Sequence, residues 1–486
     1  MNQTELTATE ADIGSAREAR AGLRARVLDL LRQLKGGDEA ESGNASDNTS
    51  DNARAGLGAL FTFAIRIASA LITFAVQVLL ARWLGGHDFG VYTYVWVWVN
   101  VVGTLCAFGL SSSAVRFIAE YATHDEPGLL RGFLRFGRWA SFMGGALAAA
   151  VGIAVLQSMP GIAEHDVRTA LSIGLLSLPA FALTDFHDGT GRARSWIGLA
   201  FIPPYILRPL LLLIFVGLAA LIGTERDATV AAAALVAATW IVAIAQLLLQ
   251  ERRFRREVPA AARAFRHAEW IKVSLPLLLL ESFALMMMNI DVLLLKLFVT
   301  PTDIGIYFAA ARTISFVSFI HFAIVAVAMP RFATAYARHD IESAGRLLGR
   351  FRLWTFAPSL LASVVLLAIG PYVLAMFGPQ YPAAWPVMVA LAGGHLARAL
   401  AGPAEALLAV SGRQVYTAVV GGITAALNIG LNLALIPKYG LLGAGAATAI
   451  SFAFQALVLS LAARRLLREG YHAPVTCAPA AQDKQD

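Results

Sequence analysis

The chain has 486 residues, of which 58% are hydrophobic and only 15% are charged, whereas a soluble domain carries roughly 25% charged residues. This composition excludes an ordinary soluble protein, and two cysteines exclude a disulfide framework. The net charge of +7 would suit a nucleic-acid partner, but in so apolar a chain the placement of the basic residues matters more than their sum.

The first 56 residues are polar and come before any apolar segment, which excludes a secretory signal peptide. Residues 17–35 are expected to form a basic amphipathic helix, because Leu23, Val27 and Leu30 recur on one face. Residues 36–52 are acidic and rich in serine and asparagine, which is typical of a linker.

Apolar segments fill the rest of the chain, and several contain no charged residue over the roughly 20 residues that cross a bilayer. Residues 353–397 lack charge over about twice that length, which predicts two helices joined by a hairpin at residues 378–382. Twelve transmembrane helices are predicted, near residues 57–82, 89–111, 136–157, 169–190, 199–222, 228–250, 272–297, 304–329, 353–375, 383–409, 414–437 and 441–463.

The connections between these helices alternate in charge. Counting the helix edges, one set of connections carries nineteen Lys or Arg and the other set carries four. Because cytoplasmic loops carry the excess of Lys and Arg, this pattern places both termini in the cytoplasm. The basic run at residues 252–256 is interpreted as an anchor at anionic lipid, and no nucleic-acid partner is expected.

The two halves of the chain are related in sequence. Residues 88–92, Asp-Phe-Gly-Val-Tyr, match residues 303–307, Asp-Ile-Gly-Ile-Tyr, at an offset of 215, and the match continues without a gap to Trp139 and Trp354. Six helices per half is an even number, so the repeats run parallel about an axis along the membrane normal. Transporters with this symmetry bind substrate between their halves and rock one half against the other.

This pattern predicts an all-α membrane protein of two six-helix bundles. The expected division is a cytoplasmic N-terminal segment at 1–56, a first bundle at 57–250, a cytoplasmic linker at 251–271, a second bundle at 272–465 and a cytoplasmic tail at 466–486.

Motifs in both halves resemble those of a known family. Residues 428–451 read Asn-Ile-Gly-Leu-Asn-Leu-Ala-Leu-Ile-Pro-Lys-Tyr-Gly-Leu-Leu-Gly-Ala-Gly-Ala-Ala-Thr-Ala-Ile-Ser, and residues 116–121 read Arg-Phe-Ile-Ala-Glu-Tyr. With residues 84–92 and Asp291, they resemble the polysaccharide and oligosaccharide flippases of the multidrug, oligosaccharidyl-lipid and polysaccharide exporter superfamily. The resemblance covers roughly residues 57–465.

The resemblance implies a multi-pass protein of the bacterial inner membrane that moves an undecaprenyl-pyrophosphate-linked oligosaccharide, such as a lipopolysaccharide precursor, to the periplasmic leaflet. It also implies coupling to an H⁺ or Na⁺ gradient, no other cofactor, and polysaccharide assembly proteins as partners. The second-half motif has a packing interpretation as well: Asn428 and Asn432 are expected to hydrogen-bond across to another helix, and Pro437 and Gly440 to form a tight turn.

Four arginines fall inside predicted helices, where a charge costs roughly 2.5 to 3.5 kcal/mol on insertion scales. These residues are Arg66, Arg208, Arg312 and Arg398. The hypothesis is that they line a cationic cavity for the pyrophosphate, because guanidinium forks stay protonated and bind phosphate in pairs of hydrogen bonds. Arg66 and Arg312 are the first choices, and pairing with a buried acid is the alternative.

Four acids are the candidates for ion coupling or gating. Glu281 and Asp291 lie within a predicted helix, where a carboxyl group removed from water holds its proton more tightly. A structural ion pair of Asp291 with Lys296 is the alternative. Glu281 stands at the position equivalent to Arg66, so the two are proposed to form a gate between the halves.

Asp185 and Asp188 lie one helical turn apart near a helix end, and a solvated mouth is the favoured interpretation. His321 and His395 are expected to be pocket or packing residues, because no second ligand stands three or four residues away, and no metal site is predicted.

Three other functions remain open, one of which, a scaffold or regulatory role in envelope assembly, is supported only by the amphipathic N-terminal segment. A membrane-embedded glycosyltransferase or polymerase is disfavoured, because the outer loops are short and no phosphate-binding loop or nucleophile motif is present. An ion-coupled multidrug antiporter of the same superfamily is the closer rival. Tyr92, Tyr94, Trp96 and Trp98 would suit drug stacking, but interfacial anchoring is the simpler explanation.

Overall fold

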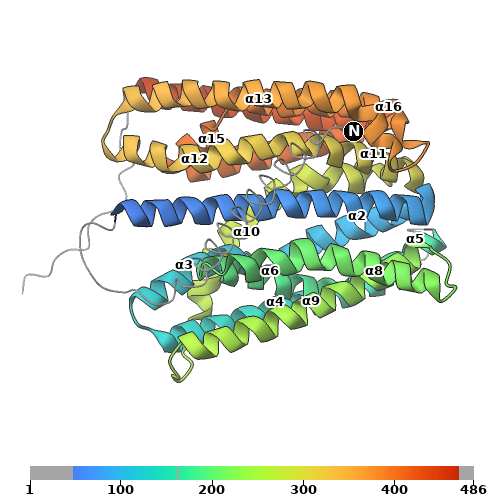
Figure 1. Cartoon of the computed structure of the whole chain (residues 1–486), viewed down its shortest axis with the longest axis horizontal. Helices are drawn as coiled ribbons and strands as arrows, with labels where there is room; N and C mark the ends of the chain where they lie inside the picture. The colour runs from blue at the N-terminus through green and yellow to red at the C-terminus, as the bar shows by residue number, and fades with distance from the viewer. Residues whose placement is uncertain (1–47, 160, 162–163, 470–486) are drawn as a thin grey trace, which may run out of the picture. The chain divides into compact units, whose positions relative to one another are not determined.

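The computed structural model of the protein describes residues 48–159, 161 and 164–469 (Figure 1). The expected amphipathic helix at 17–35 and nearly all of the tail at 466–486 lie outside these residues. The chain divides between Phe61 and Thr62 into two units, and the account below concerns the second.

The described chain is helical, which confirms the all-α fold class. The first half contains α2 (Asn48–Leu105), α3 (Leu110–Thr123), α4 (Pro127–Ser158), α5 (His165–Leu175), α6 (Leu178–Ala193), α7 (Ile197–Ile202), the π-helical turn η2 (Pro203–Leu207), α8 (Arg208–Leu221) and α9 (Ala228–Glu257). The second half contains α10 (His267–Leu295), α11 (Pro301–Ile314), η3 (Ser315–Val317), α12 (Ser318–Ala337), α13 (Ile341–Ala375), η4 (Tyr381–Ala384), α14 (Trp385–Ala401), α15 (Ala404–Val410) and α16 (Gln414–Glu469).

Among the described residues, eight helices are long and apolar enough to cross a membrane, or ten if each of two bent pairs forms one span. Two of them, Ala64–Thr123 and Gln414–Arg468, have 60 and 55 residues. Each is more than twice the roughly 20 residues that a crossing needs. Dividing both at a kink gives the twelve segments that the sequence predicts.

Glycine makes both kinks. Gly85 has φ 80° and Gly440 has φ 56°, values that residues with a Cβ rarely adopt. Ser69 and Asn100 line one cavity, although a straight helix would separate them by about 46 Å. Asn428 Nδ2 donates to Thr448 Oγ1 at 3.2 Å across the second kink, which confirms the predicted inter-helix hydrogen bond for Asn428. Both long helices are therefore hairpins. For Asn432 the prediction is wrong, because its Nδ2 donates to the Asn428 carbonyl and Oδ1 one turn earlier, at 2.9 and 3.1 Å.

Three predicted helices are interrupted, so their expected continuity is wrong. The segment 89–111 breaks at Phe108 and Gly109, which have φ 52° and 68°, and helix α3 then runs on to Thr123. The pairs α5 with α6 and α14 with α15 bend by 46° and 44°. The second bend follows Gly402, whose φ is 61°, and Pro403, which lacks the amide hydrogen that continues a helix.

The helices form two bundles with α10 crossing between them (Figure 1). In the first, α6 packs against α3, α4 and α9, and in the second, α14 packs against α11, α13 and α16. The start of α10 belongs to the first bundle, because Trp270 lies in a buried aromatic cluster with Phe117, Tyr121 and Phe133. Its Nε1 donates to the Tyr121 hydroxyl at 2.8 Å. The sequence prediction had placed Trp270 in the cytoplasmic linker at 251–271 and the helix from residue 272 in the second bundle.

The two ends of the helices differ. We call the end with the loops between α3 and α4, α9 and α10, and α12 and α13 the basic end, and the end with the two glycine kinks the far end. At the far end the two copies of the repeated motif pack together. A Cβ on Gly90 would lie 1.7 Å from the Pro301 carbonyl oxygen, and one on Gly305 would lie 3.1 Å from Phe89 Cδ1. The repeat therefore supplies the contact that closes the far end.

Candidate functional site

A central cavity of about 460 Å³ lies between the two halves. Both arms of the α2 hairpin, α7 and η2 line it from the first half, and α10, α11, η3 and α12 line it from the second. On the far-end side, Phe74 packs edge-on against Phe316 and Phe377, with ring centroids 5.5 and 5.4 Å apart. The polar residues that line the cavity include Arg66, Ser69, Gln77, Asn100, Asn289 and Arg312.

Arg66 and Arg312 enter this cavity from opposite halves. Within the described residues, neither has a carboxylate within 4.0 Å. The Arg66 guanidinium lies 5.3 Å from the centre of the Phe201 ring, and that of Arg312 lies 4.7 Å from the centre of the Phe308 ring. A guanidinium stacked on a ring keeps the N–H groups at its edge available to another partner. The two arginines thus face one space without a close carboxylate, and Arg312 Nη2 also donates to Asn289 Oδ1 at 3.5 Å.

The other two candidate arginines lie outside the central cavity. Arg208 is buried one layer behind its wall, with its guanidinium 5.0 Å from the Trp96 ring centre and 4.7 Å from that of Phe181. Arg398 lines a separate cavity of about 110 Å³, together with Glu405. Of the four arginines the structure therefore brings Arg66 and Arg312 together.

Asp291 and Glu281 on α10 have polar partners other than those expected. Asp291 is buried and accepts hydrogen bonds from the Tyr307 hydroxyl and, at 2.9 Å, from the Val292 amide. The alternative of an Asp291 pair with Lys296 is wrong, because Lys296 Nζ lies 3.6 Å from Glu164 instead.

Glu281 accepts a hydrogen bond from the Ser112 hydroxyl of α3 and so joins α10 to the first bundle. In this conformation Glu281 forms no ion pair within 4.0 Å with Arg66, a residue that the structure also describes. The gate formed by these two residues stays a prediction.

Asp185 and Asp188 lie on α6, and neither is among the residues that line the central cavity. Asp188 is only 7% exposed and pairs with Arg192 Nε at 3.0 Å, so the solvated-mouth interpretation is wrong for this residue. Asp185 is half-buried, and its backbone carbonyl accepts from Ser111 Oγ at 2.9 Å.

Several cavity residues were not among the sequence candidates. Trp96 was interpreted as an interfacial anchor, but it lines the cavity and stacks with Arg208. Gln77, Asn100 and Asn289 also line it. Their signal was present in the sequence, because an amide inside an apolar span usually faces another helix or a polar cavity rather than lipid.

The two candidate histidines, His321 and His395, fit packing positions. His395 Nδ1 lies 3.1 Å from Ser318 Oγ, and His321 is buried. In the part of the chain that the structure describes, no group of three or more His, Cys, Asp or Glu is arranged to hold a metal ion.

Comparison with known proteins bears on both sequence and fold. Residues 56–156 match the family described as polysaccharide biosynthesis protein. Sequence comparison with curated proteins gives no match. A multidrug resistance MATE family transporter of the MOP superfamily, in an inward-facing conformation, aligns over 84% of this chain and 98% of its own, with 13% identity and a TM-score of 0.66.

Two further structures share the arrangement. The lipid II flippase MurJ in an inward closed conformation aligns over 83% of this chain and 87% of its own, with 12% identity and a TM-score of 0.66. A MOP superfamily transporter from Pyrococcus furiosus aligns over 84% and 94%, with 13% identity and a TM-score of 0.60. The resemblance seen in the sequence is thus confirmed: the chain has the MOP-superfamily transporter fold, and residues 56–156 carry the pattern of the polysaccharide biosynthesis family.

Proposed function

We propose that the protein is a flippase that moves an undecaprenyl-pyrophosphate-linked oligosaccharide across the inner membrane by alternating access. The observation that carries this proposal is the pair Arg66 and Arg312, which reach one cavity from opposite halves and have no carboxylate within 4.0 Å among the described residues. A pyrophosphate bound there would be held by both halves at once. The match to the polysaccharide biosynthesis family and the likeness in fold to a lipid II flippase support a substrate of this class.

The rest of the cavity lining fits the other parts of such a substrate. The amides of Gln77, Asn100 and Asn289 can bond sugar hydroxyl groups, since an amide both donates and accepts hydrogen bonds. The rings of Trp96 and Phe316 offer apolar faces to the carbon skeleton of a sugar or an isoprenoid.

The proposed cycle begins in the conformation described here, which is packed at the far end around Gly90 and Pro301. The excess of Lys and Arg makes the basic end the cytoplasmic one, so substrate would enter from there. Release on the other side requires the far-end contact between the halves to separate.

The test uses a strain that lacks this protein and accumulates lipid-linked oligosaccharide in the inner leaflet. We expect Arg66→Gln and Arg312→Gln each to lower export at least about tenfold, since charge-assisted pairs of hydrogen bonds to phosphate would be lost. Arg398→Gln is the matched control, because it removes an arginine at membrane depth outside the central cavity. Export at the wild-type rate by both cavity variants would contradict the proposal.

The rival is an ion-coupled multidrug antiporter, and the aromatic residues Phe74, Phe316 and Phe319 of the cavity favour it. The antiporter and the flippase predict different phenotypes for a strain that lacks the protein. For the antiporter, deletion would raise sensitivity to lipophilic cations and leave lipid-linked oligosaccharide at its normal level.

A further inference from the structure

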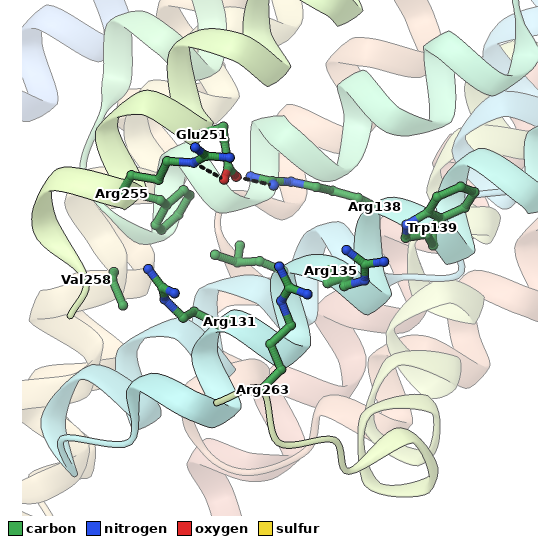
Figure 2. Close-up of a pocket in the computed structure, with 10 residues that line it drawn as sticks. Arg131, Arg135, Arg138, Trp139, Glu251, Arg255, Val258 and Arg263 are labelled. Carbon is green, nitrogen blue, oxygen red and sulfur yellow. Dashed lines mark hydrogen bonds and ion pairs between the residues drawn. The ribbon is translucent and has the colours of Figure 1, made fainter. Parts of the chain in front are cut away.

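A second cavity, of about 480 Å³, lies at the basic end between α4 and α9 (Figure 2). We call it the arginine pocket after its five arginines, which are Arg131, Arg135, Arg138, Arg255 and Arg263. One acid, Glu251, also lines it. The pocket is outside the central cavity and shares no lining residue with it.

Glu251 neutralises only one side of this pocket. Its carboxylate accepts from Arg138 Nη1 at 2.5 Å and from Arg255 Nε at 2.8 Å. Figure 2 shows Arg131, Arg135 and Arg263 gathered on the other side of the space. Among the residues that the structure describes, these three have no carboxylate within 4.0 Å. The Nε and Nη2 atoms of Arg138 are buried and without a partner as well. Several guanidinium groups of the pocket therefore have N–H donors that could bind an anion.

The depth of the pocket indicates where that anion lies. The α4 residues from Trp139 to Ser158 carry no charge, and these 20 residues span about 30 Å, the thickness of the hydrocarbon core. On α9 the uncharged stretch ends at Gln250, directly before Glu251. Trp139 itself is 55% exposed at the rim, as expected for a tryptophan at the membrane interface. The arginines thus lie at the level of the lipid headgroups.

The chain that connects the two bundles closes one wall of the pocket. Ala264 donates its amide to the Gly128 carbonyl at 3.0 Å, and a Cβ on Gly132 would lie 1.7 Å from the Ala264 carbonyl oxygen. This contact needs glycine on α4, and it carries Arg263 to its position beside Arg131. An anion bound here would hold α4, α9 and the connecting segment together.

The counterpart arginines in the second half have other contacts, although the sequence repeat extends to them. Arg346 and Arg350 are the counterparts of Arg131 and Arg135. Arg346 pairs with Glu342 on its own helix, and the Arg350 guanidinium stacks 4.5 Å from the Trp354 ring centre. Of the two counterparts, Arg346 is thus paired with an acid, whereas Arg131 and Arg135 have no carboxylate within 4.0 Å among the described residues.

We propose that the arginine pocket is a binding site for the headgroup of an inner-leaflet lipid with two phosphate groups, separate from the transport cavity. Arg131, Arg135 and Arg263 bind the phosphates, and Trp139 faces the lipid chains. The volume lies in the range of small-ligand sites, and basic pockets between helices at the cytoplasmic surface bind anionic headgroups of this kind.

Native mass spectrometry of the full chain tests this assignment, with diphosphatidylglycerol or phosphatidylglycerol added at equal phosphate concentration. The wild type should retain diphosphatidylglycerol in preference. The triple variant Arg131→Gln, Arg135→Gln, Arg263→Gln should retain at least about tenfold less, because the charged donors are gone. Retention by this variant at the wild-type level would overturn the proposal.

The matched control removes the same charge from the second half, by Arg338→Gln, Arg346→Gln and Arg350→Gln. An equal loss of lipid in this control would mean a general charge effect and would also overturn the proposal.

Inorganic pyrophosphate is the soluble probe. If it displaces the lipid at equal concentration, the site binds a free anion rather than a lipid headgroup, and the proposal is overturned. The triple variant Arg131→Lys, Arg135→Lys, Arg263→Lys keeps the positive charges and controls for folding. It should retain more lipid than the Gln variant. If the Arg66→Gln, Arg312→Gln double variant loses as much lipid as the pocket triple variant, the lipid lies in the central cavity and the proposal is overturned, whereas the proposed transport function is not.

Discussion

The two copies of the repeated motif, residues 88–92 and 303–307, have nearly the same letters and different partners. Asp88 Oδ1 accepts from the Ala228 amide at 3.0 Å and so secures the start of α9, whereas Asp303 forms a capping box with Thr300 at the start of its own helix. Tyr307 bonds the buried Asp291. The repeat equivalent of Asp291 is Val76, so Tyr92 has no such acid.

This difference shows which positions of the duplicated fold are the same in both halves and which side chains differ between them. The backbone positions of the motif are kept, because the glycines allow the halves to touch at the far end. The side chains beneath them diverge, and the divergent residues Arg66, Asp291 and Arg312 all lie in or beside the central cavity.

The largest effect is expected from a methyl group at the contact between the copies. Gly90→Ala would place its Cβ 1.7 Å from a backbone carbonyl, whereas Gly305→Ala would meet a ring carbon at 3.1 Å, which can yield slightly. Overpacking costs about 1–3 kcal/mol, and we expect Gly90→Ala to reach or exceed the upper end and Gly305→Ala to stay below the lower end. Thermal unfolding in detergent and export in cells measure both. Equal effects of the two variants would show that the copies are equivalent after all.

A smaller effect is expected at the tyrosines of the motif. Tyr307→Phe leaves the Asp291 carboxyl group buried without that donor, which should cost about 1–3 kcal/mol of unfolding free energy. Tyr92→Phe is the matched variant in the first copy and should cost less, because no carboxylate depends on it. Denaturation of the two purified variants side by side checks the order. A reversed order would remove the argument that Asp291 sets the second half apart.

The smallest effects concern the aspartates. Asp303→Ala and Asp88→Ala should each cost about 1 kcal/mol, the usual value of a lost helix-start acceptor. They differ in place: only Asp88→Ala removes an acceptor at the start of α9, where Asp227 still accepts from the Val230 amide, so it alone should speed tryptic cleavage at the nearby Arg226. Equal cleavage rates at Arg226 would contradict the different partners of the two residues.

Much of this architecture could be predicted because membrane spans and duplication leave strong marks in a sequence. Uncharged stretches gave the helices, and the 215-residue offset gave the two halves. The cost of a charge in lipid drew attention to Arg66 and Arg312, which do share the cavity. These signals can be found in the order of the residues along one chain, without knowing which helices are neighbours.

What could not be predicted depends on neighbours. Trp96 has the composition of an interfacial residue, and only the packing of α2 against η2 and α10 makes it a cavity residue. Asp188 reads as solvated near a helix end, although Arg192 one turn later already offered a partner. The bends at Ser177 and Gly402 interrupt segments whose hydropathy is continuous, because hydropathy does not record the direction of a helix axis.

The anchoring of Trp270 gives α10 a place in both bundles. Its start is held in the aromatic core of the first bundle, while Asp291 near its end bonds Tyr307 in the second. Any rocking of one bundle against the other must therefore flex this helix along its length rather than carry it as a rigid rod. Pro276 lies in the stretch between the two anchors, where its missing amide hydrogen leaves a weak turn. We therefore expect α10 to bend most easily at Pro276, close to the end that Trp270 holds in the first bundle.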